Sequence, residues 1–258
     1  MAQDASRARA FVESVDLAGT PRGLLAQDAA TEASEVFNTA RSQAQVVGST
    51  LFSFTKGVDA ETREAISGSA LLAQLVANKR SSPTETPTEW YTIYQDVLQN
   101  VGWIVQERAW TDYTTEGAAM EVHEKIIEVL TAALGPSVAA LTLIKSAVGA
   151  LKAMQPDSSW LTIFNRESQQ AEIGRFQIGL AEIGEEADVY VTMLACLIQA
   201  KSSITQVLLF KFRAEHAAFK ASNAKLSIDR SALMEVQPAI RTKIRAYQAD
   251  YVSSIKDI

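Results

Sequence analysis

The segment that most constrains the fold is the run VYVTMLACLIQ at Val189–Gln199, which is apolar at nearly every position. Its residues favour strands, and a strand with few polar positions is expected inside a sheet that is covered on both faces. Just before it, Phe176, Ile178 and Leu180 alternate with polar residues or glycine. A period of two is typical of a half-buried strand, so a second strand is predicted over 172–183.

Short connections are expected between these strands and the next segment of the chain. Turns are predicted at Gly184–Asp188 and at Lys201–Ser203, and the run TQVLLFKFR at Thr205–Arg213 predicts a third strand. Consecutive strands with short connections indicate an antiparallel meander. Residues 214–228 leave their type open, so the sheet is placed at about residues 172–222.

Helical spacing of apolar residues governs the rest of the chain. Helices are predicted over Leu24–Val47, from an N-cap at Asp59, and over Thr88–Arg108. A last helix is capped by Asp229 and carries an apolar stripe as far as Ile255.

These patterns define the expected fold class as α+β. A mainly helical N-terminal half packs with a small antiparallel sheet (about residues 172–222) and a long C-terminal helix. Residues 1–258 are expected to form a single domain, since this length fits one hydrophobic core. Its parts are a helical region at 1–155 and a sheet with the final helix at 156–258.

The most apolar helical segment is Ile126–Leu151, whose only charges are Glu128 and Lys145. Its length suits a bilayer span, but Gly135–Pro136 divides it into two helices. A buried helical hairpin is one interpretation. A hairpin that inserts into a membrane is the other.

The net charge and the N-terminal sequence limit which partners and which cellular location are expected. The net charge is -6 with no polybasic run, which argues against a nucleic-acid partner. The start MAQDASRARAFVES has no apolar core of a secretory signal. We therefore expect a protein that is cytoplasmic as made, with membrane association or export by a signal-less route left open.

Motifs of common enzymes are missing from the sequence. It contains no GxGxxG, no GxxxxGK[ST] and no GxSxG, so no nucleotide cofactor and no catalytic residue are assigned. The histidines are His123 and His216, and the offsets of Glu121, His123 and Glu124 do not share one helix face. No metal site is therefore assigned, and we expect a non-enzymatic protein.

The single cysteine, Cys196, excludes an intramolecular disulfide and lies inside the central strand. Its apolar setting opposes a catalytic thiolate, so an inert buried thiol is one interpretation. The other is a palmitate-like fatty acid bound as a thioester, because each buried methylene contributes about 0.8 kcal/mol. The candidate residues of a lipid tunnel are Tyr190, Thr192, Leu194, Ile198, Leu208 and Phe210.

The layout resembles the Erwinia virulence factor family. The shared features are chain length, a helical first half, and one cysteine in an apolar segment, here TMLACLIQ around Cys196. The resemblance implies an α/β-type fold, a fatty acyl group on Cys196, and a membrane-directed role in virulence.

Four functions therefore stay open, the last of them an enzyme of unfamiliar type, which the missing motifs disfavour. The leading hypothesis is a non-enzymatic bacterial virulence or host-interaction factor, a membrane-associated lipoprotein acylated on Cys196. The first alternative is a small α-helical pore-forming toxin component that uses the hairpin 126–151. The second is an intracellular lipid-binding module. The expected partners are a lipid or membrane and, for the leading hypothesis, a host factor.

Overall fold

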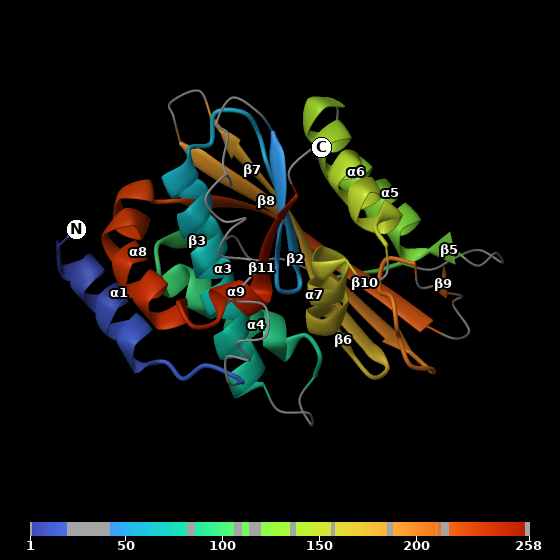
Figure 1. Ribbon diagram of the computed structural model, residues 1–258, viewed down its shortest axis with the longest axis horizontal. Coiled ribbons are helices and arrows are strands. Elements are labelled where there is room, and N and C mark those ends of the chain that lie inside the picture. Colours follow the sequence, from blue (N-terminus) through green and yellow to red (C-terminus); the bar gives the residue numbers. More distant parts are fainter. Residues whose placement is uncertain are drawn as a thin grey trace.

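A mixed β-sheet runs through the centre of the molecule, with helices on both of its faces (Figure 1). The computed structural model describes residues 2–19, 42–81, 86–105, 110–113, 120–134, 138–155, 158–184, 188–209, 211–212 and 217–255. Within this part of the chain the sheet has nine strands, and a separate pair of short strands lies beside it.

The sheet is built around two long central strands, β7 and β8. Across the sheet the order is β11 (Val252–Ile255), β1 (Gln43–Val47), β2 (Thr50–Phe54), β7 (Ile173–Ile183), β8 (Val189–Ala200), β10 (Ala217–Ile228) and β3 (Trp103–Val105). In addition, β4 (Thr111–Tyr113) pairs with β10, and β6 (Gln169–Gln170) pairs with β7. The β2–β7 pair is parallel and the other pairs are antiparallel. The separate pair is β5 (Met120–Glu121) with β9 (Lys211–Phe212).

Helices form a layer on each face of this sheet (Figure 1). The first layer holds α1 (Ala2–Ser14), α3 (Ala60–Arg80), α4 (Glu89–Asn100) and α8 (Arg230–Ile244). The second layer holds α5 (Val122–Leu134), α6 (Val138–Ala153) and α7 (Ser159–Ser168). A short helix, α9 (Gln248–Tyr251), leads into β11.

Each face of the sheet has its own hydrophobic core. On β8, Val191 and Met193 pack with the first helical layer, whereas Leu194 and Cys196 pack with the second. We call the second cluster the hairpin-side core, because α5 and α6 form a helical hairpin over it. The predicted strands at 172–183 and 189–199 and the predicted division of the two faces of β8 are confirmed.

The α+β class is confirmed, but the sheet is wider than the expected antiparallel one. It includes β1 and β2 from the region expected to be helical, and β2 adds a parallel pairing. The predicted helix over 24–47 is wrong at its end, where residues 43–47 form β1; residues 24–41 lie outside the described part.

The reason for β1 lies in its polar side chains. Gln43 and Gln45 are buried, and their amide oxygens accept hydrogen bonds from Arg63 Nη1 and Ser67 Oγ of α3. Arg63 itself is fully buried, and its Nε donates to the Val58 carbonyl at 2.7 Å. Buried polar groups need such partners, so α3 holds these glutamines in a strand.

The predicted helix over 88–108 is too long. It ends at Asn100, and Gly102 adopts a φ of 100°, a left-handed conformation that favours glycine. The Gly102 carbonyl accepts from Asp229 N at 3.1 Å, so a contact from the other end of the chain fixes this turn. Trp103–Val105 then form β3.

The third predicted strand, over 205–213, is also wrong. Among the described residues of this segment, 205–209 contain a bend and a turn, and 211–212 are extended, as β9. Val207 N donates to Asn165 Oδ1 at 3.2 Å, and the Leu208 carbonyl accepts from His123 N at 3.1 Å. These backbone groups bond to the second helical layer, so they are not free for a ladder. The next strand of the sheet is β10, which settles most of the open segment.

The final helix begins as predicted, with Asp229 accepting from Ala232 N at 3.0 Å. It contains Pro238 and ends at Ile244 rather than continuing to Ile255. Residues 252–255 instead form β11, which pairs with β1.

Candidate functional site

Cys196 lies in the middle of the sheet, on β8. Its register partners are Phe176 on β7 and Ala221 on β10. The residue is 0% exposed, and it belongs to the hairpin-side core. Burial raises the pKa of the Cys196 thiol well above its ordinary value. In this folded state the sulfur is therefore a neutral, enclosed group rather than a nucleophile.

The predicted tunnel residues do not all gather around this sulfur. Leu194, Ile198 and Leu208 share the hairpin-side core with Cys196 and are buried. Tyr190 and Thr192 lie on the same face of β8 but are only half-buried. Phe210 lies outside the described residues.

The rest of the hairpin-side core comes from residues that local pattern did not place beside Cys196. Phe176 packs against Phe164 of α7 with their ring centroids 5.9 Å apart. The other helical members are Val122, Ile126, Val129, Leu130, Ala140, Leu143, Ile144, Ala147, Val148, Leu151, Leu161 and Ile163. The second helical layer, formed by α5, α6 and α7, therefore covers the face of the sheet that carries Cys196.

The backbone at Cys196 is held from the opposite face of the sheet. Tyr91 of α4 places its Oη 2.5 Å from the Cys196 carbonyl oxygen and 3.1 Å from the Phe176 carbonyl oxygen. Burial raises the pKa of Tyr91 well above its ordinary value, so the phenol remains a donor. Tyr91 lies within the helix predicted over 88–108, but no local signal showed that it reaches across to β7 and β8.

The α5–α6 hairpin is apolar inside and weakly charged outside. The predicted helices on both sides of Gly135–Pro136 are confirmed, and that turn lies outside the described residues. The exposed face of α6 consists mainly of small residues: Ala139, Thr142, Lys145, Ser146, Gly149, Lys152 and Ala153. The described helices include none that is both long and apolar enough to cross a membrane.

The hairpin carries a buried basic residue. Lys125 of α5 is buried, with its Nζ 2.8 Å from Oε1 and 2.9 Å from Oε2 of Glu128. The same Nζ lies 5.4 Å from the centre of the Tyr113 ring. Its charge is therefore paired, and it does not interrupt the apolar lining.

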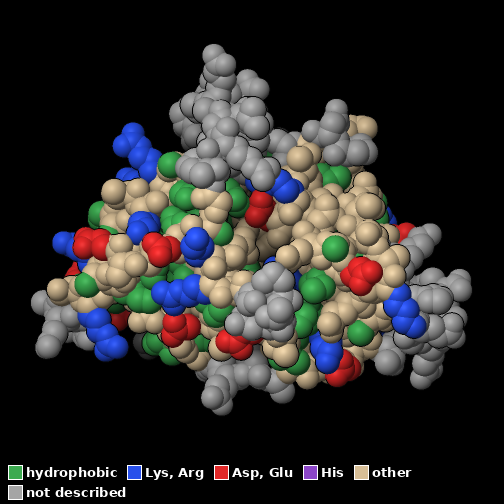
Figure 2. Space-filling model, turned by 90° about the horizontal axis from the view of Figure 1, so that it is seen from below, with side chains coloured by type: hydrophobic (Ala, Val, Ile, Leu, Met, Phe, Trp, Pro, Cys, Tyr) green, Lys and Arg blue, Asp and Glu red, His purple; other side chains and the backbone are tan. Residues whose placement is uncertain are grey.

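The described residues hold no cluster of three or more metal-ligating side chains. His123 lies at the start of α5 and contacts Glu121 and Lys152, whereas His216 is outside the described residues. On the face shown in Figure 2, acidic and basic side chains are interspersed among the coloured residues, without a continuous basic surface.

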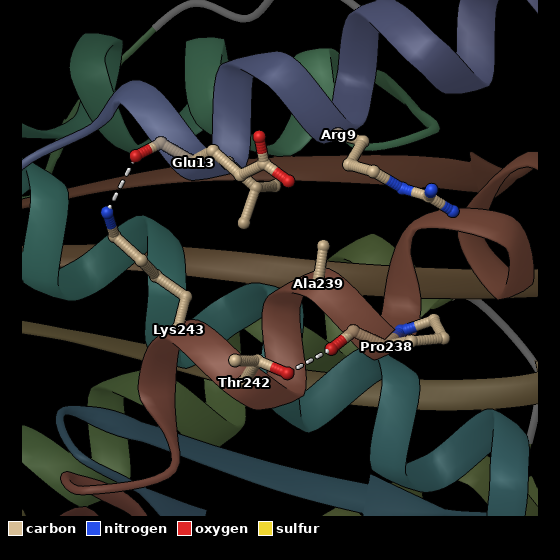
Figure 3. A pocket seen from close by; sticks show the side chains of 7 residues that line it. Arg9, Glu13, Pro238, Ala239, Thr242 and Lys243 are labelled. Atoms are coloured by element: carbon tan, nitrogen blue, oxygen red, sulfur yellow. Dashed lines mark hydrogen bonds between the residues drawn. The ribbon is translucent and has the colours of Figure 1, made fainter.

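A surface groove lies between α1 and α8 (Figure 3). Arg9, Val12 and Glu13 line it from α1, and Pro238, Ala239, Thr242 and Lys243 line it from α8. Lys243 Nζ donates to the Glu13 carbonyl at 2.9 Å and so ties the two helices together. The groove is open and is lined by both acidic and basic side chains, so its lining does not indicate which class of ligand it would bind.

The structure thus defines a three-layer α+β protein with an enclosed cysteine in the core between the sheet and the second helical layer. No protein-family model matches the chain, and no curated protein matches it. A solved structure titled "delta-endotoxin" is similar with 12% identity and a TM-score of 0.40, over 69% of this chain and 79% of that one. The structure of the Evf virulence factor is similar with 9% identity and a TM-score of 0.32, over 89% of this chain and 92% of that one. At these levels, the function of this protein rests on its own residues.

Proposed function

We propose that this protein is a membrane-directed bacterial virulence or host-interaction factor that acts without catalysis. Its α5–α6 hairpin would leave the sheet and bind lipid. The observation that carries the proposal is the construction of the hairpin, whose apolar side covers the sheet while its outer side carries few charges. Moving that apolar side from the core into lipid keeps it out of water.

Helix length decides how the hairpin would bind. Helix α5 has 13 residues and α6 has 16, which makes them about 20 and 24 Å long. The hydrocarbon core of a bilayer is about 30 Å thick, so neither helix spans it. We therefore place the hairpin in the interfacial plane, with its apolar side toward the acyl chains.

The test uses a dye at Leu141, a half-buried position of α6 at the rim of the hairpin-side core. Leu141→Cys is made in a Cys196→Ala background and labelled with an environment-sensitive fluorophore. Phosphatidylcholine vesicles are used, because a net charge of -6 gives no attraction to anionic lipid. Binding should shift the emission to the blue, and nitroxides on the acyl chains should quench it.

Ser231→Cys, labelled in the same background, is the control, because Ser231 is exposed on α8 in the other helical layer. Its dye should show neither change. Vesicle binding that leaves the Leu141 dye unquenched would argue against the hairpin as the membrane element. Absence of vesicle binding would overturn the membrane-directed function.

We also propose Cys196 as the site of a palmitate-like thioester. Support comes from its place among Leu194, Ile198 and Leu208, between the sheet and the hairpin. Because the thiol is 0% exposed, attachment would require the hairpin layer to be open or not yet formed. Acylation and lipid binding by the hairpin would therefore both require the hairpin layer to be separated from the sheet.

Intact mass of the protein made in its native host tests the acylation. The expected mass exceeds the chain mass by one long acyl group, which neutral hydroxylamine removes and Cys196→Ser abolishes. A mass equal to the bare chain would leave Cys196 as a core thiol. Uptake of free fatty acid without any vesicle binding would instead favour an intracellular lipid-binding module. Leakage of vesicle contents that requires both helices to span the bilayer would favour a pore-forming component.

A further inference from the structure

Three charged or titratable side chains meet at the base of the α5–α6 hairpin. They are Glu121 on β5, His123 in the first turn of α5, and Lys152 in the last turn of α6. Their side chains are 25%, 14% and 40% exposed. The cluster therefore joins the two ends of the hairpin where water and protons reach it.

The contacts of the imidazole define its protonation. Nδ1 lies 3.2 Å from the Leu208 carbonyl oxygen and 3.2 Å from Glu121 Oε2, both of which are acceptors. Nε2 lies 3.0 Å from Lys152 Nζ, which is a donor. Two acceptors at Nδ1 and a donor at Nε2 match the tautomer that carries its proton on Nδ1 and offers the Nε2 lone pair to the ammonium.

A second proton on His123 would break this arrangement. It would place an N–H on Nε2, directed at the Lys152 ammonium, and two positive charges would lie about 3 Å apart. Glu121 Oε2 lies 3.2 Å from Nδ1 and 3.4 Å from Lys152 Nζ, so one carboxylate would then serve two cations. Glu124 accepts from Glu121 N at 3.2 Å, and Lys211 of β9 is the register partner of Glu121.

We propose that His123, Glu121 and Lys152 form an acid-sensitive latch, in which protonation of His123 expels Lys152 and frees α6 from the base of α5. The proposal rests on the proposed function, because it gives the condition under which the hairpin would reach lipid. Acid supplies this second proton, so the latch is closed while the ring carries one proton and opens on acidification.

Hydrogen exchange of the α5 and α6 amides tests the latch without lipid. After correction for intrinsic exchange rates, protection of both helices in the full chain should fall about tenfold from about pH 7.5 to about pH 5. His123→Gln keeps a polar side chain that cannot become charged, and Lys152→Gln removes the repelled cation. Each should abolish the fall, whereas His216→Gln should keep it.

Two results would overturn the latch. One is unchanged hairpin protection in the unmodified chain on acidification, and the other is a fall that persists in His123→Gln or Lys152→Gln. The dye at Leu141, read with phosphatidylcholine vesicles at both pH values, separates the two proposals. Loosening at low pH without lipid contact supports the latch and counts against the membrane function. Equal lipid contact at both pH values without loosening supports the membrane function and counts against the latch.

Discussion

Two tyrosines one turn apart on α4 differ in what their hydroxyl groups contact. Both are buried, and burial raises the pKa of each phenol above its ordinary value. Tyr91 Oη lies at hydrogen-bond distance from the carbonyls of Cys196 and Phe176. Among the described atoms Tyr94 Oη has no hydrogen-bond partner, although Thr50 lies near it. Their removal should therefore have different effects.

We predict that Tyr91→Phe lowers the free energy of unfolding by about 1 to 2 kcal/mol, the typical loss of a buried hydrogen bond. Tyr94→Phe should leave it unchanged or raise it slightly, because it deletes a buried hydroxyl without a bond. Urea denaturation followed by circular dichroism measures both. Equal losses in the two variants would mean that the Tyr91 bond adds nothing to stability.

Two glycines, Gly48 and Gly149, should likewise respond differently to replacement by alanine. Gly48 has a φ of 54°, and a Cβ there would clash with the side-chain amide of Gln74, whose Oε1 accepts from Ser49 N at 2.9 Å. We predict that Gly48→Ala lowers the free energy of unfolding by more than about 2 kcal/mol. Gly149→Ala on α6 meets nothing within 4 Å and should raise it by about 0.5 to 1 kcal/mol. Thermal unfolding measures both, and a loss at Gly149 would contradict the open position of that residue.

At the scale of elements, the two faces of α6 should respond oppositely to charge. Ile144 is 1% exposed and faces the sheet, whereas Thr142 lies on the outer face. We predict that Ile144→Asp costs more than about 3 kcal/mol or unfolds the protein, because it buries an unpaired carboxylate. Thr142→Asp should change stability by less than about 0.5 kcal/mol.

The control for that pair is Thr92→Asp, at an exposed position near the start of α4 in the other layer. It should behave like Thr142→Asp in solution. Urea midpoints measure all three variants. A tolerated Ile144→Asp would show that the hairpin is detached from the sheet even without lipid.

For the whole molecule, the central strands couple the two cores. β7 contributes Ala181 to one core and Phe176 to the other, and β8 likewise supplies both. We therefore predict that the described layers unfold in one transition, with near- and far-ultraviolet circular dichroism coinciding. A fragment 1–150 should be unfolded, because it lacks β7, β8 and β10. If that fragment is cooperatively folded, the expectation of a single domain fails.

Local pattern was sufficient where the hydrophobic period or the capping residue that defines an element lies within or next to that element in sequence. The period of two over 172–183, the apolar run of β8 and the caps at Asp59 and Asp229 all predicted elements that the structure contains. The hairpin helices followed from their apolar content and the intervening Gly135–Pro136. Burial of Cys196 followed in the same way, because its whole neighbourhood in sequence is apolar.

Tertiary contacts decided the segments whose polar or backbone groups find partners far along the chain. Gln43 and Gln45 occupy a strand because Arg63 and Ser67 satisfy their side chains, and residues 252–255 extend because β1 offers them a ladder. Val207 and Leu208 do not join a strand because their backbone groups form hydrogen bonds with α7 and α5. The sequence by itself determined which residues are apolar enough to be buried and whether they recur with the period of a helix or of a strand. Only the folded chain decided which distant group satisfies each buried polar atom, because that depends on layers that local spacing does not encode.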